Sequence, residues 1–441
     1  MARLARLALL ALVVASAGTA TGEVGGTDET LVWNQVMLDA IVAGTLGNPQ
    51  TIRMAATVNT AMFDARNGVG QKYTPIFVTR AAPPGTHRRA AVVQAAYVTL
   101  TAFYPAQLAR FDSQRARSLA EFSGDDPARV QRGIDWGEHV ANQVLAWRAT
   151  DGFSDPVPPF TGAGAVIGQW GSATGAAMAP GNISFTAPFV LTSNAQFQSA
   201  FPRPWASLDS TAYAASFNEV ATMGVKTGSA RTPDQTHIAF FFNGYATNDY
   251  VEAAIQIASA RRISRAKSSR IFALLTIAMH DTSVTVFRAK RDFGENPADV
   301  TWRPLLAIPK ADLDGNPNTA PIAGWTPLIA TPNHPEYPAS HPGSHGSGPR
   351  VLHHFFGDVN AFEVHPAFNT VFPGPPEGGV RPRRYARISD MAQEGIDART
   401  YGGMHFRGAS QATAMVGARV ADYVLANATR PVGADDDSDT E

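Results

Sequence analysis

The second half of the chain carries basic side chains whose types and spacing are typical of an oxyanion site. Lys290 closes a predicted helix, and Arg303 follows after a loop. Arg399 and His405 flank a short run with two glycines, which lets the chain turn and present both side chains to one point. Arginine supplies forked donors and lysine a compact charge, so the set predicts binding of a tetrahedral oxyanion such as phosphate or vanadate.

A histidine-rich stretch, TPNHPEYPASHPGSHG (Thr331–Gly346), lies between these cations. Its four prolines block helix continuation and predict a rigid loop that directs imidazoles toward one place. One histidine of such a site can bond the central atom of the oxyanion while another moves a proton. His341 and His345 are four residues apart, which on a helix would suit zinc, but Pro342 and Gly343 are expected to interrupt the helix.

Composition excludes several functional classes. The 36 Lys and Arg residues balance 37 Asp and Glu residues, so no overall field recruits nucleic acid or an anionic membrane. The chain has no cysteine, which excludes thiolate nucleophiles and Cys-based metal sites. The DLDGN run at Asp312 lacks the later carboxylates of a calcium loop and is interpreted as a turn.

The two ends of the chain have their own signatures. Residues 1–20 combine two arginines, a short apolar run and small residues, which predicts a secretory signal peptide and a periplasmic or secreted protein. No other stretch approaches the ~20 apolar residues of a membrane span, so none is expected in the mature protein. The acidic residues 431–441 predict a disordered tail.

Helical periodicity dominates the rest, so the fold class is predicted to be mainly α. Helices are expected over 106–122, 127–150, 210–226 and 268–290, among others. Residues 151–204 are rich in Gly and Pro and predict a long irregular segment packed across the helices. The shared Ala-Met-x-Asp of NTAMFDAR (59–66) and TIAMHDTS (276–283) is compatible with two bundles of common design.

The order Lys290, Arg303-Pro304, HPEYPASH, then Arg399 and His405 resembles the vanadium-dependent haloperoxidases and the type 2 phosphatidic acid phosphatases. VWNQVMLDAI, APFVLTSNAQF and DLDGNPNTAPIAGWTPL are also similar to secreted bacterial members. The resemblance implies two packed helical bundles. We expect an N-terminal half, residues 27–260, and a site-bearing half, residues 261–428.

The resemblance also implies roles for single residues. His405 would bond vanadium, or act as nucleophile in a phosphatase, and His341 would be the acid–base histidine. The remaining oxyanion contacts would come from Lys290, Arg303, Arg399 and the backbone of Ser340. Lys290 would also be catalytic, because it would polarise the bound peroxide. His334 matches a histidine of bromoperoxidase-like members, and Phe287 another halide-side position.

Three departures from the family pattern stand out. Ala339-Ser340 replaces the usual Ser-Gly, which removes a hydroxyl donor and predicts weaker oxyanion binding. Thirteen positions, in place of seven, separate Lys290 from Arg303, so the intervening residues must loop out. His345 competes with His341 for the acid–base role, but the preceding HPEYP favours His341.

Three functions remain open on this basis. With vanadate, the site would oxidise halide, preferably bromide, with peroxide to hypohalous acid, and an organic acceptor would take up the halogen. With phosphate esters as substrates, the same residues would serve a soluble exported acid phosphatase that works through a phosphohistidine. A non-catalytic oxyanion-binding helical protein is the third alternative.

Overall fold

The computed structural model describes residues 27–164, 166–205, 207–371, 374–375 and 379–433. The predicted signal peptide, residues 1–20, and most of the predicted acidic tail lie outside the described residues. The α-helices are α2 (Glu29–Ala43), α3 (Asn48–Gly70), α4 (Arg88–Phe103), α5 (Leu108–Ala120), α6 (Pro127–Ala149), α7 (Thr211–Met223), α8 (Pro233–Phe241), α9 (Ala246–Arg261), α10 (Arg265–Glu295), α11 (Pro304–Ala307), α12 (His341–Phe356), α13 (Ile388–Tyr401) and α14 (Arg407–Asn427).

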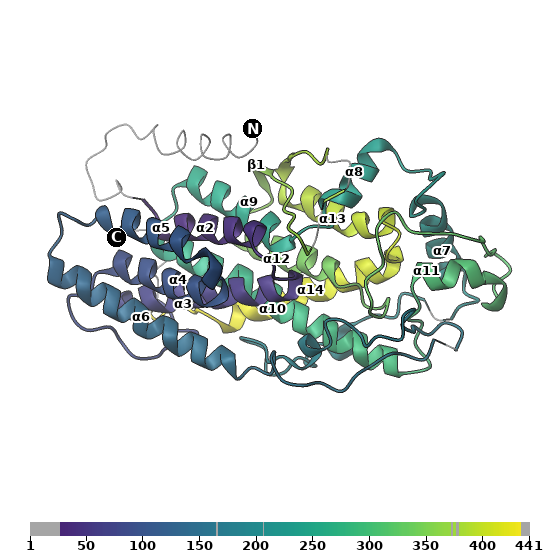
Figure 1. Ribbon diagram of the computed structural model, residues 1–441, viewed down its shortest axis with the longest axis horizontal. Helices are drawn as coiled ribbons and strands as arrows, with labels where there is room; N and C mark the ends of the chain where they lie inside the picture. Colours follow the sequence, from purple (N-terminus) through teal and green to yellow (C-terminus); the bar gives the residue numbers. More distant parts are fainter. Residues whose placement is uncertain (1–26, 165, 206, 372–373, 376–378, 434–441) are drawn as a thin grey trace.

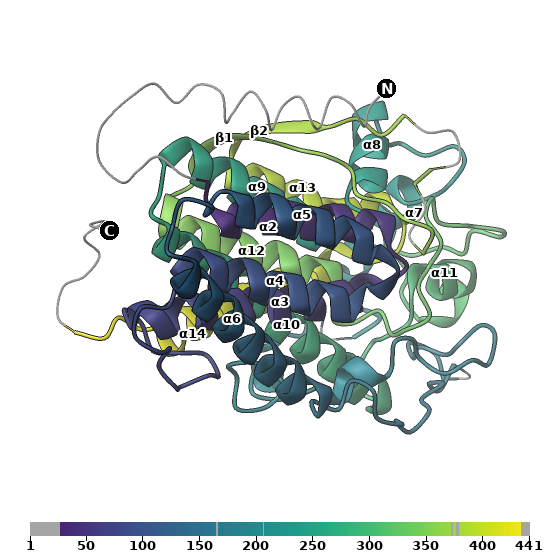
Figure 2. The same ribbon diagram turned by 60° about the vertical axis from the view of Figure 1, so that its left-hand side comes forward.

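The prediction of a mainly helical fold with packed bundles is confirmed (Figure 1). In the first bundle α3, α4 and α6 pack on one another, and in the second α12 packs on α13 and α14. Helix α10 contacts α3 as well as α12 and α14, so it joins the two bundles (Figure 2). Among the described residues the only sheet is an antiparallel pair, β1 (Val359–Val364) and β2 (Arg383–Arg387).

Helix α10 forms the centre of the core. Its length and apolar composition would allow it to cross a membrane, but 94% of its most apolar window is buried inside the fold. Aliphatic and aromatic residues such as Ile271, Leu274 and Ile277 are fully buried on it. Burial of this kind is what a core helix shared by two bundles requires.

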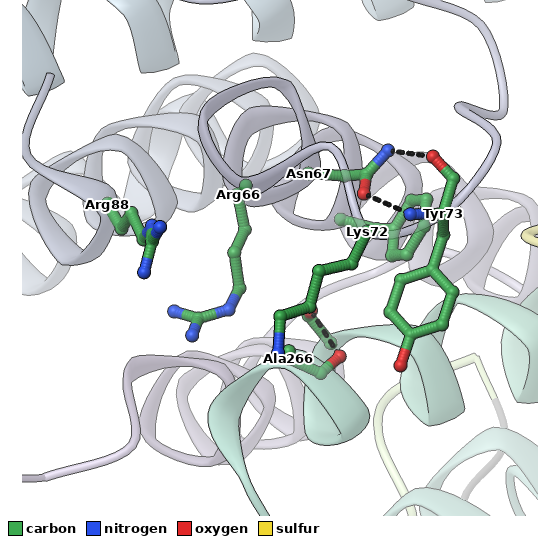
Figure 3. A pocket seen from close by; sticks show the side chains of 9 residues that line it. Arg66, Asn67, Lys72, Tyr73, Arg88 and Ala266 are labelled. Atoms are coloured by element: carbon green, nitrogen blue, oxygen red, sulfur yellow. Dashed lines mark hydrogen bonds between the residues drawn. The ribbon is translucent and has the colours of Figure 1, made fainter. Parts of the chain in front are cut away.

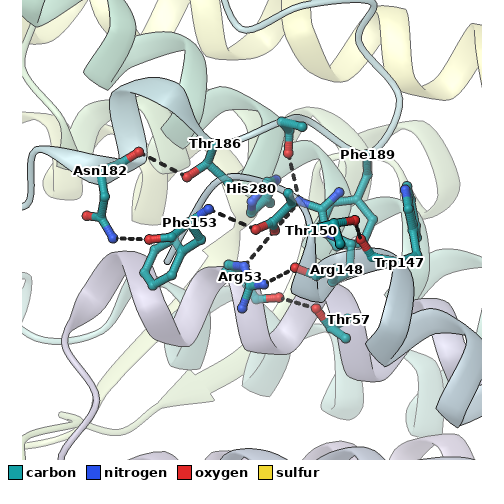
Figure 4. A network of polar contacts seen from close by, with 12 residues as sticks. Arg53, Thr57, Trp147, Arg148, Thr150, Phe153, Asn182, Thr186, Phe189 and His280 are labelled. Atoms are coloured by element: carbon teal, nitrogen blue, oxygen red, sulfur yellow. Dashed lines mark hydrogen bonds and ion pairs between the residues drawn. The ribbon is translucent and has the colours of Figure 1, made fainter. Parts of the chain in front are cut away.

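The described residues of the segment 151–204 are irregular as predicted. Their only helical turns are the short 3₁₀ turns η2 (Asn182–Phe185) and η3 (Gln198–Ala200), and Gly162 and Gly171 form an isolated β-bridge. Buried polar groups fix the segment to the helices (Figure 4). Asp151 accepts hydrogen bonds from Arg53 of α3 and Arg148 of α6, each at 2.7 Å. Because buried backbone donors need acceptors, Asp281 of α10 completes the attachment by accepting from the N–H groups of residues 189–191.

The aspartates of the two Ala-Met-x-Asp motifs make the same kind of contact in the structure. Asp64 of α3 accepts hydrogen bonds from the backbone N–H groups of residues 76–78, as Asp281 does from residues 189–191. Each motif therefore places one buried carboxylate on a central helix, where it fixes three consecutive amides of a crossing segment. Burial raises the pKa of Asp64 to about 6, although the three amides act in the opposite direction.

Two predicted boundaries were wrong, and both lie near the basic residues. Helix α10 continues to Glu295, so Lys290 lies inside it and does not close it. Helix α12 begins at His341 and includes Pro342 and Gly343, which were expected to break it. A proline in the first helical turn lacks only an N–H that has no intrahelical acceptor, so the helix tolerates it there.

Candidate active site

Arg303 is the centre of the cluster of predicted site residues. It is 1% exposed, and its NH1 group lies 2.7 Å from Nε2 of His405. Its NH2 group lies 2.7 Å from Nδ1 of His334, and its Nε donates to the His334 carbonyl. The first residue of α11 is Pro304, so Arg303 is held where the chain enters that helix.

Lys290 approaches the same centre from α10. It is fully buried, and its Nζ donates to the carbonyl of Pro335 at 2.7 Å and lies 3.4 Å from that of Glu336. Burial, with Arg303 nearby, lowers the pKa of Lys290 well below its usual value. The lysine therefore joins α10 to the histidine-rich loop.

A buried carboxylate, Glu336, lies among these cations, and the sequence interpretation missed it. Its Oε2 is 2.7 Å from Nδ1 of His405 and 3.7 Å from NH1 of Arg303. The backbone N–H of Phe406 donates to its Oε1 at 2.9 Å. Burial raises the pKa of Glu336 to about 7, against the opposing effect of Arg303 and Lys290. Its position inside HPEYP, between His334 and His341, could have identified it as a site residue.

Arg399, from the last turn of α13, is a buried guanidinium with few good acceptors. NH1 is 3.5 Å from the Phe242 carbonyl, NH2 contacts the sulfur of Met404, and Nε has no hydrogen-bond partner among the described residues. Burial and the neighbouring Arg303 lower its pKa to about 9. Unused donors on a buried cation are the chemistry that an incoming anion would satisfy.

The turn between Arg399 and His405 behaves as predicted. Helix α13 ends at Tyr401, and Gly403 adopts a φ of +75°, a left-handed conformation that favours glycine. A Cβ on Gly403 would also lie 2.4 Å from the carbonyl of Gly224. His405 N bonds the Arg399 carbonyl at 3.4 Å, and α14 begins two residues later at Arg407.

His341 and Ser340 lie at the start of α12, and both are partly exposed. The other predicted oxyanion residues are buried, so the cluster meets solvent on this side. Nε2 of His341 is 3.1 Å from Nδ2 of Asn48, and the ring also bonds the backbone of Gly244. Asn48, the first residue of α3, was missed because nothing local in the sequence links the two bundles.

His345 is placed apart from the cluster. Its Nδ1 lies 2.9 Å from the hydroxyl of Tyr250, and its ring packs edge-on against Phe242. A Cβ on Gly395 would come within 2.3 Å of the ring, so only glycine leaves room for it. Burial lowers the pKa of His345 to about 3, as expected for a neutral core histidine. Although His341 and His345 share one helix, the described residues contain no group of three potential metal-ligating side chains.

The predicted halide-side residues lie together. The rings of Phe287 and His334 pack edge to face with centroids 5.5 Å apart, and both residues are 4% exposed. Phe287 belongs to an apolar cluster with Trp170, Met178 and Ile183. The irregular segment thus supplies the apolar wall beside His334.

The extra residues between Lys290 and Arg303 consist of the last turn of α10 and a loop. The amides of Thr301 and Trp302 donate to the carbonyl of Gly168, and Glu336 N donates to the carbonyl of Thr301. Backbone hydrogen bonds therefore connect this loop to both the irregular segment and the histidine-rich stretch. That attachment fixes Arg303 and Glu336 in place.

A pocket lies near the opposite end of α10 from Lys290 (Figure 3). It is lined by Arg66, Lys72 and Arg88 together with Ala266 and Ser269. Ser269 precedes Lys290 by 21 residues on one helix, a separation of ~30 Å at 1.5 Å per residue. This pocket is distinct from the histidine cluster.

Comparisons with known proteins give the fold its name. Residues 270–434 match the family model of the VCPO second helical-bundle domain. A bacterial vanadium-dependent iodoperoxidase superposes with a TM-score of 0.74 at 21% identity, covering 90% of this chain and 96% of that one. The chain has the vanadium haloperoxidase fold. A holo-type bacterial vanadium-dependent chloroperoxidase gives a TM-score of 0.63 at 15% identity, over 90% and 95% of the two chains. No curated protein sequence matches significantly.

The resemblance to the vanadium haloperoxidase superfamily is thus confirmed. This fold implies vanadate, and the charges of the cluster fit such an anion. Three cations, Lys290, Arg303 and Arg399, face one carboxylate, Glu336. The N-terminus of α12, with its positive end of the helix dipole, adds to the excess of positive charge.

Anion binding to this vanadium haloperoxidase fold should take up protons. An anion stabilises the charged forms of Lys290 and His341 and the neutral form of Glu336, and so raises all three pKa values. The pKa of His341 is held well below its usual value by burial and by Arg399, and that of Glu336 is about 7. Affinity for sulfate, which does not titrate near neutrality, should therefore rise as the pH falls. Calorimetry in buffers of different ionisation enthalpy measures the uptake, and proton release would contradict it.

Proposed function

We propose that this chain is a vanadate-dependent haloperoxidase that oxidises halide with hydrogen peroxide to hypohalous acid, with bromide favoured over chloride. The observation that carries the proposal is the contact of Arg303 with both His405 and His334 inside a buried group of three cations. The fold of vanadium iodo- and chloroperoxidases supports it.

Each residue has a defined task under this proposal. His405 would bond vanadium through Nε2, and Lys290, Arg303, Arg399 and the amide of Ser340 would hold the oxygens of vanadate. When bound, vanadate supplies the Lewis acid that activates peroxide toward halide. Arg303 must give up its present contact with Nε2 of His405, which lies at 2.7 Å, to reach an oxygen.

His341 would transfer protons to or from the bound oxyanion, but its ring nitrogens already have hydrogen-bond partners. Asn48 donates to Nε2, and the other ring nitrogen bonds the backbone of Gly244, so both nitrogens have protein partners. Proton transfer to or from an oxyanion therefore requires Asn48 to release Nε2. Because His341 is partly exposed, this exchange is open to water.

The halide side would be formed by His334 and Phe287. Arg303 donates to Nδ1 of His334, so the neutral ring carries its proton on Nε2. An N–H donor beside an apolar wall suits a large, weakly hydrated halide. Export to the periplasm or the medium remains part of the proposal and follows from residues 1–20 alone.

The deciding experiment divides the purified protein between two assays. One half receives orthovanadate, peroxide and either bromide or chloride, and the other a phosphate monoester. We expect vanadate-dependent bromination that exceeds chlorination and is inhibited by phosphate, which competes for the same cations. Ester hydrolysis without halogenation at saturating vanadate would support the phosphatase, and tight oxyanion binding without either reaction would support the binding protein.

A further inference from the structure

One side-chain atom of Glu336 and one of His405 face each other in the buried cluster. Nδ1 of His405 and Oε2 of Glu336 are buried, lie 2.7 Å apart, and have no hydrogen-bond partner among the described residues. Their relative angle falls short of a formed hydrogen bond, although the distance is that of one. Since unpaired buried polar atoms are costly, each atom is the natural partner of the other.

The protonation of His405 follows from Arg303. A guanidinium only donates, so Nε2 of His405 at 2.7 Å must present its lone pair. A neutral His405 then carries its proton on Nδ1, which faces Glu336. The other carboxylate oxygen, Oε1, already accepts from the amide of Phe406 at 2.9 Å. Both oxygens of Glu336 are therefore placed as acceptors, as in an ionised carboxylate.

We propose that Glu336 is a positioning residue that holds His405 with its proton on Nδ1 and its Nε2 lone pair free for the central atom of the oxyanion. The inference rests on the proposed function for its ligand, but the pairing of Glu336 with His405 is independent of it. A carboxylate behind a ligating histidine fixes the ring and increases the electron donation of the other nitrogen. It also offsets one of the three cationic charges around the site.

The first test uses two anions to separate the effect of Glu336 on His405 from its effect on the charge of the site. Glu336→Gln keeps the size and an acceptor oxygen but removes the charge. Orthovanadate, bonded through Nε2, should bind about 10–100-fold more weakly to this variant. Inorganic phosphate, held by the cations alone, should bind at least as tightly as before because a negative charge is gone. A parallel loss for both anions, or no change for orthovanadate, would overturn the proposal.

A matched control exists elsewhere in the chain. Glu252 of α9 lies 2.7 Å from Nδ1 of His365, the same kind of contact in a less buried place. Glu252→Gln should leave the affinities for both anions unchanged. Thermal unfolding of each variant shows that it is folded under the binding conditions.

The second test reads the histidine directly and needs no vanadate. In protein with ¹⁵N-labelled histidine, the resonances absent from His405→Gln identify His405. We expect the Nδ1–H form in the natural protein and also in Glu336→Met, because Arg303 still donates to Nε2. The chemical shifts of Nδ1 and of its proton should change in Glu336→Met, which offers no acceptor. Unchanged shifts of Nδ1 and its proton in Glu336→Met would overturn the pairing. If the natural protein fails to bind orthovanadate, the proposed function fails, and this measurement alone decides the role of Glu336.

Discussion

Replacing His405 with alanine should abolish the retention of orthovanadate and the bromination that depends on it. His405 is 1% exposed, and its Nε2 is placed beside Arg303 at the centre of the cationic cluster. Loss of a group that hydrogen-bonds a metal-ligating side chain costs about 10–100-fold in metal affinity, and loss of the ligating nitrogen itself should cost more than 100-fold. Equilibrium dialysis of orthovanadate followed by a bromination assay measures both effects.

His345→Ala is the control for this prediction. It deletes an equally buried imidazole, but one that contacts Tyr250 and Phe242. The cavity left beside Gly395 should lower the free energy of unfolding by about 2–4 kcal/mol, while the folded protein keeps its affinity for orthovanadate. If His345→Ala abolished binding and His405→Ala did not, the assignment of the site histidines would be wrong.

Arg399→Met should weaken orthovanadate binding and at the same time stabilise the fold. The guanidinium is 1% exposed, its Nε has no hydrogen-bond partner in the part of the chain that the structure describes, and burial lowers its pKa to about 9. A charge-assisted hydrogen bond contributes about 1.5–3 kcal/mol, so losing one lowers affinity by roughly 10–150-fold. Replacing a poorly paired buried charge with an apolar side chain should raise the free energy of unfolding by about 1–4 kcal/mol. Binding calorimetry and thermal unfolding test the two parts.

Arg407→Met provides the comparison. Arg407 pairs with Glu219 at 2.7 Å and with Asp397, so its charge is already satisfied at the start of α14. Its removal should lower stability and leave orthovanadate affinity within about twofold. A loss of affinity in Arg407→Met as large as that in Arg399→Met would mean that any nearby cation serves and that Arg399 has no specific place.

Local patterns in the sequence predicted the helical class, the irregular segment 151–204 and the turn between Arg399 and His405. Helical periodicity is set by which face of each segment must be buried, and it can be read within one segment. Glycine likewise reports a local backbone need, as the positive φ of Gly403 shows. The sequence resemblance also named the superfamily whose fold the chain has.

Only the tertiary structure decided which charged and polar groups share one environment. Glu336, Asn48 and His345 sit in or near motifs that the sequence displays, yet their roles depend on partners 69 to 293 positions away: Glu336 lies beside His405, Asn48 beside His341, and His345 beside Tyr250. The physical reason is that burial and electrostatic pairing act through space between packed helices. A carboxylate in a proline-rich loop looks solvated until the fold removes its water and surrounds it with cations.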